Sequence, residues 1–584
     1  MGKKDYERAI ADFDQAIKLN PSYALAYNER GTARIATGKT ELAIRDFDAA
    51  IRINPTYDIA FNNRGYAYRN HNQPDRAIQD LDQAIRINAS FGLAYRNRGI
   101  AYYDKREFDR AAQDLSQSIR LSPDDLTALN ERGVAYGAKN DSERAIRDFD
   151  QIIKLDPKNA VAFNNRGYSY RNRGDYDRAI ADFDEAIKLN PNYAAAFFNR
   201  GIAYSERLDL DRAIQNFDQA IKLNPAYAAV YHERGMAYYE KYDFDRAIAD
   251  FDQIVKLRSN YVIAAVPRSS VADLQRGYQR SVSDISPQFA LNPVFALAFN
   301  DRGIAFVAKG DLNRGIADFD QALKINATFA TALHNRGNAY GEKGDLDRAI
   351  RDYDQAIKIN PRGAQVYYDR GVSYYSQRKY DQAIADFDQV VRIDPKDALA
   401  YYNRGIAYYG KNEFDRAIAD LNKAIEVDPR ISLAFHNRGN SYARKRDFDR
   451  AIADFDDAIK LDAKYAVSFN DRGLAFGAKG QIDRAITDFD QAVKLDAKFA
   501  PAFTNRGVAY ATKGQTDRAI ADFDVAIKLN PSYAVAFYNR ANAYYDKGDY
   551  DKAVTDYDQS IKLDRKSTRL NSSHIQKSRM PSSA

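Results

Sequence analysis

A 34-residue period runs through most of the chain and limits it to folds built from stacked, similar units. Arg30-Gly31 begins a series of Arg-Gly pairs that follows this interval as far as Arg506-Gly507. An Asn-Pro or Asp-Pro pair, such as Asn190-Pro191, returns with the same period. Self-similarity at a fixed interval of this length predicts a solenoid of supersecondary units instead of several separate globular domains.

Residues 160–193 form one unit of the series and predict two helices. Phe163 and Tyr170 lie on one face of the expected first helix, and Ile180 and Phe183 lie on one face of the expected second. The apolar residues of both halves follow helical spacing and lack the alternation of a strand. Each unit is therefore expected to be a helical hairpin.

Short boundary signals separate the two expected helices. Gly174 predicts a left-handed stop after the first helix, and Asp175 predicts an N-cap for the second. Pro191 predicts the end of the second helix and so of the unit, because proline is common just beyond a helix end.

Small or aromatic residues recur at seven positions of nearly every unit. In residues 160–193 they are Phe163, Gly167, Tyr170, Ala179, Phe183, Ala186 and Pro191. This pattern resembles the tetratricopeptide repeat (TPR), and the resemblance covers residues 24–564. It implies an all-α fold, a right-handed α-solenoid (TPR superhelix) of stacked antiparallel helix pairs, in which the first helices line a concave groove.

The repeat frame predicts five parts of the chain. They are an orphan second helix of a truncated repeat (1–23), seven repeats (24–261), a degenerate repeat (262–295), eight repeats (296–564) and a non-native or disordered tail (565–584). The start of the tail resembles one reading frame of a sequencing-library adapter. We therefore expect a fragment truncated at both ends.

The frame at 262–295 keeps the phase of the repeat but interrupts both expected helices. Pro267 falls in the first helix and Pro287 in the second, and an interior proline costs a helix roughly 3 kcal/mol. We interpret the frame as a decayed repeat; an error in the reading frame of the gene is the alternative. A decayed repeat predicts weak coupling between the repeats on its two sides.

Charged residues in the repeats favour ion pairs over metal sites. Arg166 stands at unit position 7, where the family often has Leu, and Asp182 at position 23 is its expected partner. Asp182 and Asp184 are two residues apart on a helix, so their carboxylates point apart and do not chelate one ion. Three histidines share position 5 and are three units apart: His232, His334 and His436. We expect them in the groove or on the surface, without a shared metal.

Composition and charge exclude several classes of function. The net charge is +6, but residues 565–584 carry five basic and no acidic residues, which leaves 82 basic against 81 acidic in the rest. A near-neutral body lacks the basic stripe that a nucleic-acid binder needs. The absence of cysteine excludes disulfides, and no apolar stretch is long enough for membrane insertion. We also find no catalytic nucleophile motif or phosphate loop, and we expect no enzyme activity and no cofactor.

Position 6 of the repeat carries the candidate binding residues. Nine of them are amides: Asn63, Asn97, Asn165, Asn199, Asn335, Asn403, Asn437, Asn505 and Asn539. In the family this position faces the groove, where an amide can grip an extended peptide backbone. The row resembles the asparagine ladder of O-linked N-acetylglucosamine transferase repeats. Position 2 is apolar, as in Leu93, where chaperone-binding members have a Lys for a carboxylate clamp, so such a clamp is not expected.

Two alternatives remain open for the groove residues. The position-6 amides can instead bond to the neighbouring repeat or to solvent. Tyrosines at position 12 either add apolar contacts to the groove or serve ordinary packing: Tyr103, Tyr239, Tyr375, Tyr409 and Tyr545.

The sequence favours a non-catalytic scaffold that binds peptide segments of partner proteins in its groove. The alternative is the substrate-recognition region of a larger enzyme, such as a glycosyltransferase, whose catalytic domain lies outside this chain. The expected partners are other proteins or peptides, and the uncapped ends leave end-to-end self-association open. No apolar signal segment follows Met1, so a cytoplasmic location is the default expectation.

Overall fold

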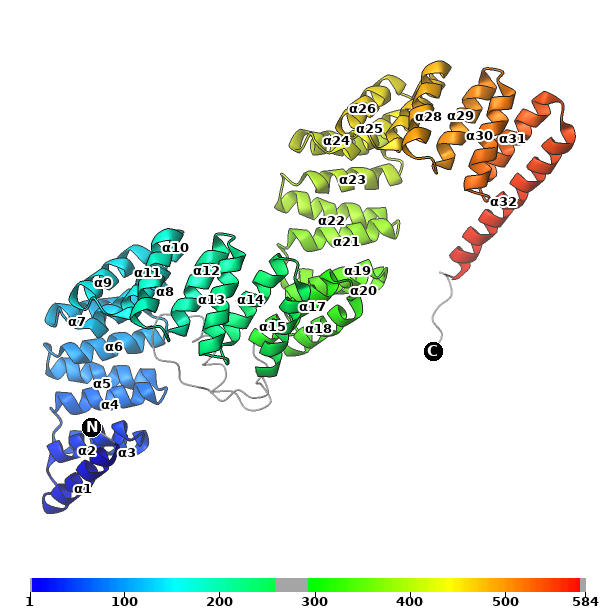
Figure 1. Cartoon of the computed structure of the whole chain (residues 1–584). Helices are drawn as coiled ribbons and strands as arrows, with labels where there is room; N and C mark the ends of the chain where they lie inside the picture. The colour runs from blue at the N-terminus through cyan, green and yellow to red at the C-terminus, as the bar shows by residue number, and fades with distance from the viewer. Residues whose placement is uncertain (1–2, 258–292, 578–584) are drawn as a thin grey trace. The chain divides into compact units, whose positions relative to one another are not determined.

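Helices of 13 and 14 residues alternate along most of the chain in the computed structural model (Figure 1). The structure describes the backbone of residues 3–257 and 293–577 and the side chains of residues 5–257 and 295–564. The secondary structure of these residues consists of 31 helices without a strand. The chain divides into two compact units, residues 1–327 and 328–584.

The first unit holds the helices from α1 to α18. They are α1 (Lys3–Leu19), α2 (Ala24–Ala36), α3 (Thr40–Ile53), α4 (Asp58–Asn70), α5 (Pro74–Ile87), α6 (Gly92–Asp104), α7 (Phe108–Leu121), α8 (Leu126–Ala138), α9 (Ser142–Leu155), α10 (Ala160–Asn172), α11 (Tyr176–Leu189), α12 (Ala194–Glu206), α13 (Leu210–Leu223), α14 (Ala228–Glu240), α15 (Phe244–Leu257), α17 (Pro293–Ala308) and α18 (Leu312–Ile325).

The second unit holds the helices from α19 to α32. They are α19 (Ala330–Glu342), α20 (Leu346–Ile359), α21 (Ala364–Ser376), α22 (Tyr380–Ile393), α23 (Ala398–Gly410), α24 (Phe414–Val427), α25 (Ser432–Arg444), α26 (Phe448–Leu461), α27 (Ala466–Ala478), α28 (Ile482–Leu495), α29 (Ala500–Thr512), α30 (Thr516–Leu529), α31 (Ala534–Lys547) and α32 (Tyr550–Lys577).

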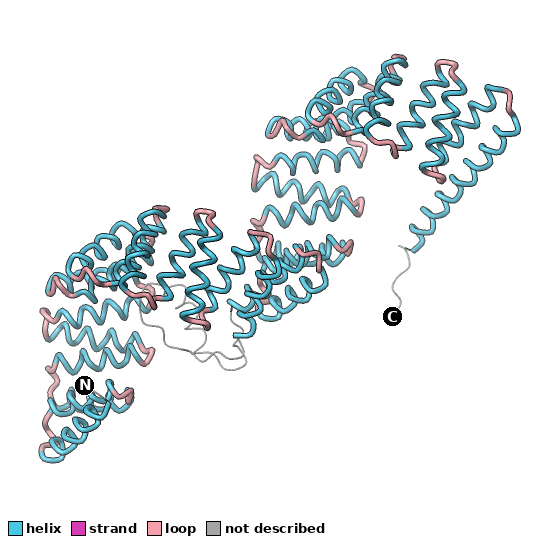
Figure 2. The backbone as a smooth tube through the Cα atoms, viewed as in Figure 1, coloured by secondary structure: helices cyan, strands magenta, loops and turns pink. Residues whose placement is uncertain are grey.

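The boundary signals act as the sequence predicts. Between α10 and α11, Gly174 has a positive φ of 77°, and the Asp175 side chain accepts a hydrogen bond from the backbone N–H of Arg178. The left-handed residue reverses the chain, and the cap satisfies one of the free N–H groups at the start of α11. Short loops join successive helices in the described parts of both units (Figure 2).

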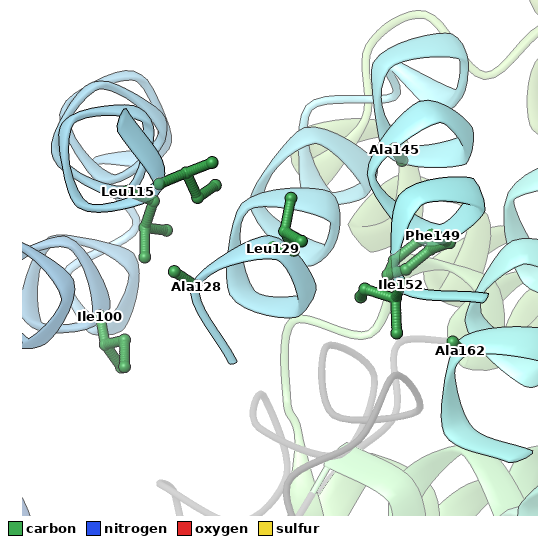
Figure 3. Close-up of a cluster of buried hydrophobic side chains, with 9 residues drawn as sticks. Ile100, Leu115, Ala128, Leu129, Ala145, Phe149, Ile152 and Ala162 are labelled. Carbon is green, nitrogen blue, oxygen red and sulfur yellow. The ribbon is translucent and has the colours of Figure 1, made fainter. Parts of the chain in front are cut away.

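The core forms where the two helices of a repeat approach closely. A Cβ added at Gly167 in α10 would lie 2.8 Å from Cε1 of Phe183 in α11, so a larger residue here would force the phenylalanine ring to shift. Ala179 and Phe183 are completely buried. Similar contacts continue from repeat to repeat: Leu115 of α7 and Leu129 of α8 belong to one buried cluster (Figure 3).

These observations confirm the predicted all-α TPR solenoid of paired helices. At the start of the chain, α1 packs against α2. The degenerate repeat proposed at 262–295 lies outside the described residues, except for the first turn of α17. At the other end, the backbone of α32 continues as a helix to Lys577, beyond the last periodic residue, Asp564.

Candidate functional site

The first helices of the repeats present a face on which aliphatic side chains flank the position-6 row. Leu399 and Leu433 at position 2 are 51% and 40% exposed, and Leu474 and Val508 at position 9 are 47% and 40% exposed. Positions 2, 6 and 9 are four and three residues apart, so they share one side of a helix. We call this surface the first-helix face.

In the first unit, the position-6 asparagines connect neighbouring repeats. Asn97, Asn165 and Asn199 are only 5%, 1% and 2% exposed. Each side-chain N–H donates to the side-chain oxygen of a position-5 asparagine in the preceding repeat. The pairs are Asn97 to Asn62, Asn165 to Asn130 and Asn199 to Asn164, each at 2.9 Å, and the half-buried Asn63 to Asn28 at 3.0 Å. Three of these four amides are therefore inaccessible to a partner.

In the second unit, Asn403 and Asn437 are half-buried and bond differently. Their Nδ2 atoms donate to the hydroxyl oxygens of Tyr368 and Tyr402 in the preceding repeat, at 2.7 and 3.2 Å. Each also donates to a carbonyl oxygen of its own helix, at 2.9 and 2.8 Å. Within the described part of the chain, no donor contacts the Oδ1 atom of either amide, which leaves both oxygens available as acceptors.

The remaining position-6 amides are also half-buried. Asn505 donates to Oδ1 of Asn470 in the preceding repeat at 2.9 Å, and Asn335 and Asn539 are of intermediate exposure. The nine amides thus divide by environment. Most of those in the first unit are covered by the adjacent repeat, whereas those in the second unit are partly accessible.

Histidine–aspartate pairs replace the amide contact at two further junctions. Nε2 of His232 lies 2.8 Å from Oδ2 of Asp301, and Nε2 of His334 lies 2.6 Å from Oδ2 of Asp369. Burial by itself would lower the pKa of His232, but hydrogen bonds with Asp301 and Glu233 outweigh it and raise the pKa to about 9. His232 is therefore a charged link between repeats at neutral pH.

The third histidine, His436, is 5% exposed and has the opposite character. Its Nδ1 lies 3.0 Å from Oγ of Ser468, and Nδ2 of Asn440 donates to its Nε2 at 3.0 Å. The Asp471 carboxylate is more distant, at 3.5 Å from Nε2. Burial lowers the pKa of His436 to about 4, so the ring is neutral at pH 7.

The expectation that these histidines face the groove or solvent is therefore wrong for His436, which lies between repeats. The signal that sequence reasoning missed is an offset of 35 residues. His334 and Asp369, like His436 and Asp471, are position-5 and position-6 residues of successive repeats.

The arginine at position 7 forms the predicted ion pair and a second one as well. Nε and Nη2 of Arg166 donate to Asp182 at 2.8 and 2.7 Å, and Nη1 donates to Asp150 of the preceding repeat at 2.7 Å. The hydrogen bond with Asp182 is the main cause that raises the pKa of Arg166. Asp184, by contrast, pairs with Arg200 of the next repeat. The two carboxylates of Asp-x-Asp thus serve different arginines, as their helical separation predicts.

The position-12 tyrosines pack against an aromatic ring of their own repeat. The ring centroids are 5.4–5.6 Å apart in five pairs: Tyr103–Phe108, Tyr239–Phe244, Tyr375–Tyr380, Tyr409–Phe414 and Tyr545–Tyr550. Tyr103 is 3% exposed, whereas Tyr545 is 59% exposed. Packing is therefore their common role, and Tyr545 also adds to the surface.

Acidic and histidine side chains do not gather into a metal site in the described ranges, where no group of three or more that could hold an ion occurs. None of the helices described is both long and apolar enough to cross a membrane.

Family models of the same repeat match most of the chain. Models described as "Tetratricopeptide repeat" match residues 1–58, 62–125, 96–160, 160–193, 183–215, 228–261, 334–398, 398–431, 432–465 and 534–567, and a model described as "TPR repeat" matches 209–242, 303–344, 473–514 and 509–548. No curated protein matches the chain.

Solved TPR structures are similar to parts of the chain. The crystal structure of MamA is 29% identical, covers 28% of this chain and 96% of its own, and has a TM-score of 0.27. YrrB, described as a TPR protein with an unusual peptide-binding site, is 25% identical, with coverages of 32% and 95% and a TM-score of 0.28. A chain of the APC/C hetero-tetramer Cut9-Hcn1 is 15% identical, with coverages of 88% and 95% and a TM-score of 0.39.

The repeat models cover more than half of the residues, and the structure consists of stacked helix pairs with the glycine, alanine and aromatic core that the repeat requires. The chain belongs to the tetratricopeptide repeat family.

Proposed function

We propose that this chain is a non-catalytic scaffold that binds extended segments of partner proteins on its first-helix face. A solenoid offers a long, continuous surface of this kind, because each repeat contributes one helix to it. All the matched family models describe the repeat itself.

The observation that carries the proposal lies on α23 and α25. There, the exposed Leu399 and Leu433 stand one helical turn from Asn403 and Asn437. The N–H groups of both amides are engaged within the array, whereas their Oδ1 atoms have no donor among the described residues. The surface therefore presents hydrogen-bond acceptors beside aliphatic contacts.

This arrangement fits an extended peptide with apolar side chains. A backbone N–H can donate to an amide oxygen without regard to the side chain, while an apolar side chain covers the leucine next to it. The four groups are uncharged, so the affinity should depend little on salt concentration.

The test starts with a displayed library of random 12-residue peptides, selected against the full chain. The selected peptide is then titrated by calorimetry into a variant that combines Asn403→Ala, Asn437→Ala, Asn505→Ala and Asn539→Ala. A neutral hydrogen bond contributes roughly 0.5–1.5 kcal/mol, so we expect the loss of two or more to weaken binding by about 10- to 100-fold.

A matched control separates binding from stability. Tyr368→Phe combined with Tyr402→Phe removes the contacts that Asn403 and Asn437 make with the preceding repeats but keeps both amides. This double variant should bind as the wild type does, and circular dichroism should show equal helicity in both variants. Unchanged affinity of the quadruple variant, or failure of the library to yield any binder, would contradict the proposal.

A further inference from the structure

Three kinds of contact hold successive repeats in a fixed register. Position 7 bonds to position 25 of the preceding repeat, 16 residues earlier, as Arg234 does to Asp218. Position 14 bonds to position 18 of the preceding repeat, 30 residues earlier, as Lys241 does to Asp211. Position 6 meets position 5 of the preceding repeat, 35 residues earlier.

All three contacts also join the repeat α14–α15 to the repeat α17–α18, although residues 258–292 separate these repeats in sequence. Their separations there are 50, 64 and 69 residues, each larger than the usual value by one period of 34. The pairs are Arg302–Asp252, Lys309–Asp245 and His232–Asp301. The same repeat positions are therefore paired at this junction as at the other junctions of the array.

The apolar core continues across the same junction. Phe251 and Ile254 of α15 are completely buried and share a cluster with Ala298, Ala305 and Phe306 of α17. The face of α15 that a following repeat would cover is thus already covered by α17.

The chemistry of the facing residues also matches. Elsewhere a histidine at position 5 meets an aspartate at position 6 of the next repeat in the stack, as in His334–Asp369. The residue 35 positions after His232 in the sequence is Pro267, which cannot form this pair. In the structure, the position-6 residue that faces His232 is Asp301, and it does form the pair.

We infer that the repeat α14–α15 and the repeat α17–α18 are direct neighbours in the stack, although the 34 residues 258–291 lie between them in sequence. Removing these residues joins Leu257 to Asn292-Pro293. This restores the Leu-Asn-Pro junction seen at Leu223-Asn224-Pro225. The inference does not depend on the proposed function.

Distances between spin labels test the inference directly, because the chain has no cysteine of its own. Position 22 is exposed on the second helix of each repeat concerned: Ala181, Gln215, Ala249 and Ala317. The test chain carries Ala249→Cys with Ala317→Cys. One control, Gln215→Cys with Ala249→Cys, measures the distance between adjacent repeats, which we call one step. The other, Ala181→Cys with Ala249→Cys, measures the distance across two steps, at the same sequence separation as the test pair.

Direct stacking predicts that the test distance in the full chain equals the one-step control. It also predicts no change when residues 258–291 are deleted from the test chain. A test distance equal to the two-step control, or a distance that shortens by one step on deletion, would overturn the inference. Circular dichroism of each labelled chain checks that the repeats remain folded.

Discussion

Residue 15 of each described repeat reverses the chain in a left-handed conformation. Seven repeats place glycine there, and eight place another residue, including Leu208 with φ 62°. A residue with a Cβ atom is strained by about 1–2 kcal/mol in this region, whereas glycine is not. Leu208 is 81% exposed, so packing recovers little of this cost.

We expect Leu208→Gly to stabilise the array. Relief of strain exceeds the entropy that glycine adds to the unfolded chain, and the net gain should be about 0.5–1 kcal/mol. Denaturant unfolding measures it. Gly174→Leu, which makes the reverse change at the same repeat position, should destabilise the array, and a gain of stability in that variant would refute the argument.

His232 and His436 occupy the same repeat position but should respond to pH in opposite directions. The folded pKa of His232, about 9, lies above the usual 6.5. Its contribution to stability is therefore full below pH 6.5 and is lost as the pH rises through 9. A pKa difference of this size corresponds to about 3 kcal/mol in the free energy of unfolding, present below pH 6.5. The Tm difference between the wild type and His232→Gln should shrink between pH 6.5 and 9.5.

The folded pKa of His436, about 4, lies below the usual value because the ring is buried. The unfolded chain takes up a proton between pH 6.5 and 4 while the folded chain does not, so stability falls as the pH falls through this window. His436→Gln should remove that part of the acid sensitivity. Equal Tm profiles of the wild type and both histidine variants would contradict both assignments.

The arginine at position 7 bonds the first helix of a repeat to the second. Two neighbouring repeats differ in the charge of its partner and so allow that charge to be tested. Arg166 of α10 faces Asp182 of α11, whereas Arg200 of α12 faces the neutral Asn216 of α13. Asp182 is 6% exposed, so its replacement leaves a half-buried guanidinium without its main counter-charge.

Asp182→Asn should therefore lower the free energy of unfolding by about 1.5–3 kcal/mol, the value of a hydrogen bond to a charged group. Asn216→Asp supplies the missing carboxylate and should raise it. Denaturant titration of the two variants checks both signs. Destabilisation by both would indicate that shape, and not charge, governs this site.

At the scale of the whole molecule, stability is distributed over contacts between neighbouring repeats. If α17 covers α15, the amides around Phe251 should be as protected as those around Phe217 in α13, because both phenylalanines are completely buried. Hydrogen exchange followed by mass spectrometry compares the two segments. Exchange of α15 as fast as that of α1, which lies at the start of the stack, would show that its outer face is bare.

Much of this molecule follows from local pattern. The helix pairs, the turn at Gly174, the cap at Asp175 and the core around Phe183 were predictable, because spacing along one helix decides which side chains share a face. The pair Arg166–Asp182 was predictable for a similar reason, since both residues belong to one helical hairpin.

Tertiary structure decided the contacts between repeats. The sequence placed nine asparagines at position 6, but only packing shows that Asn165 is covered by its neighbour while Asn403 keeps an available oxygen. Only the tertiary structure shows that His232 pairs with Asp301, 69 residues away. Local periodicity is the same for every repeat, so it cannot specify which repeat lies against which; that choice depends on the complementary charge and shape of surfaces that meet only in the folded stack.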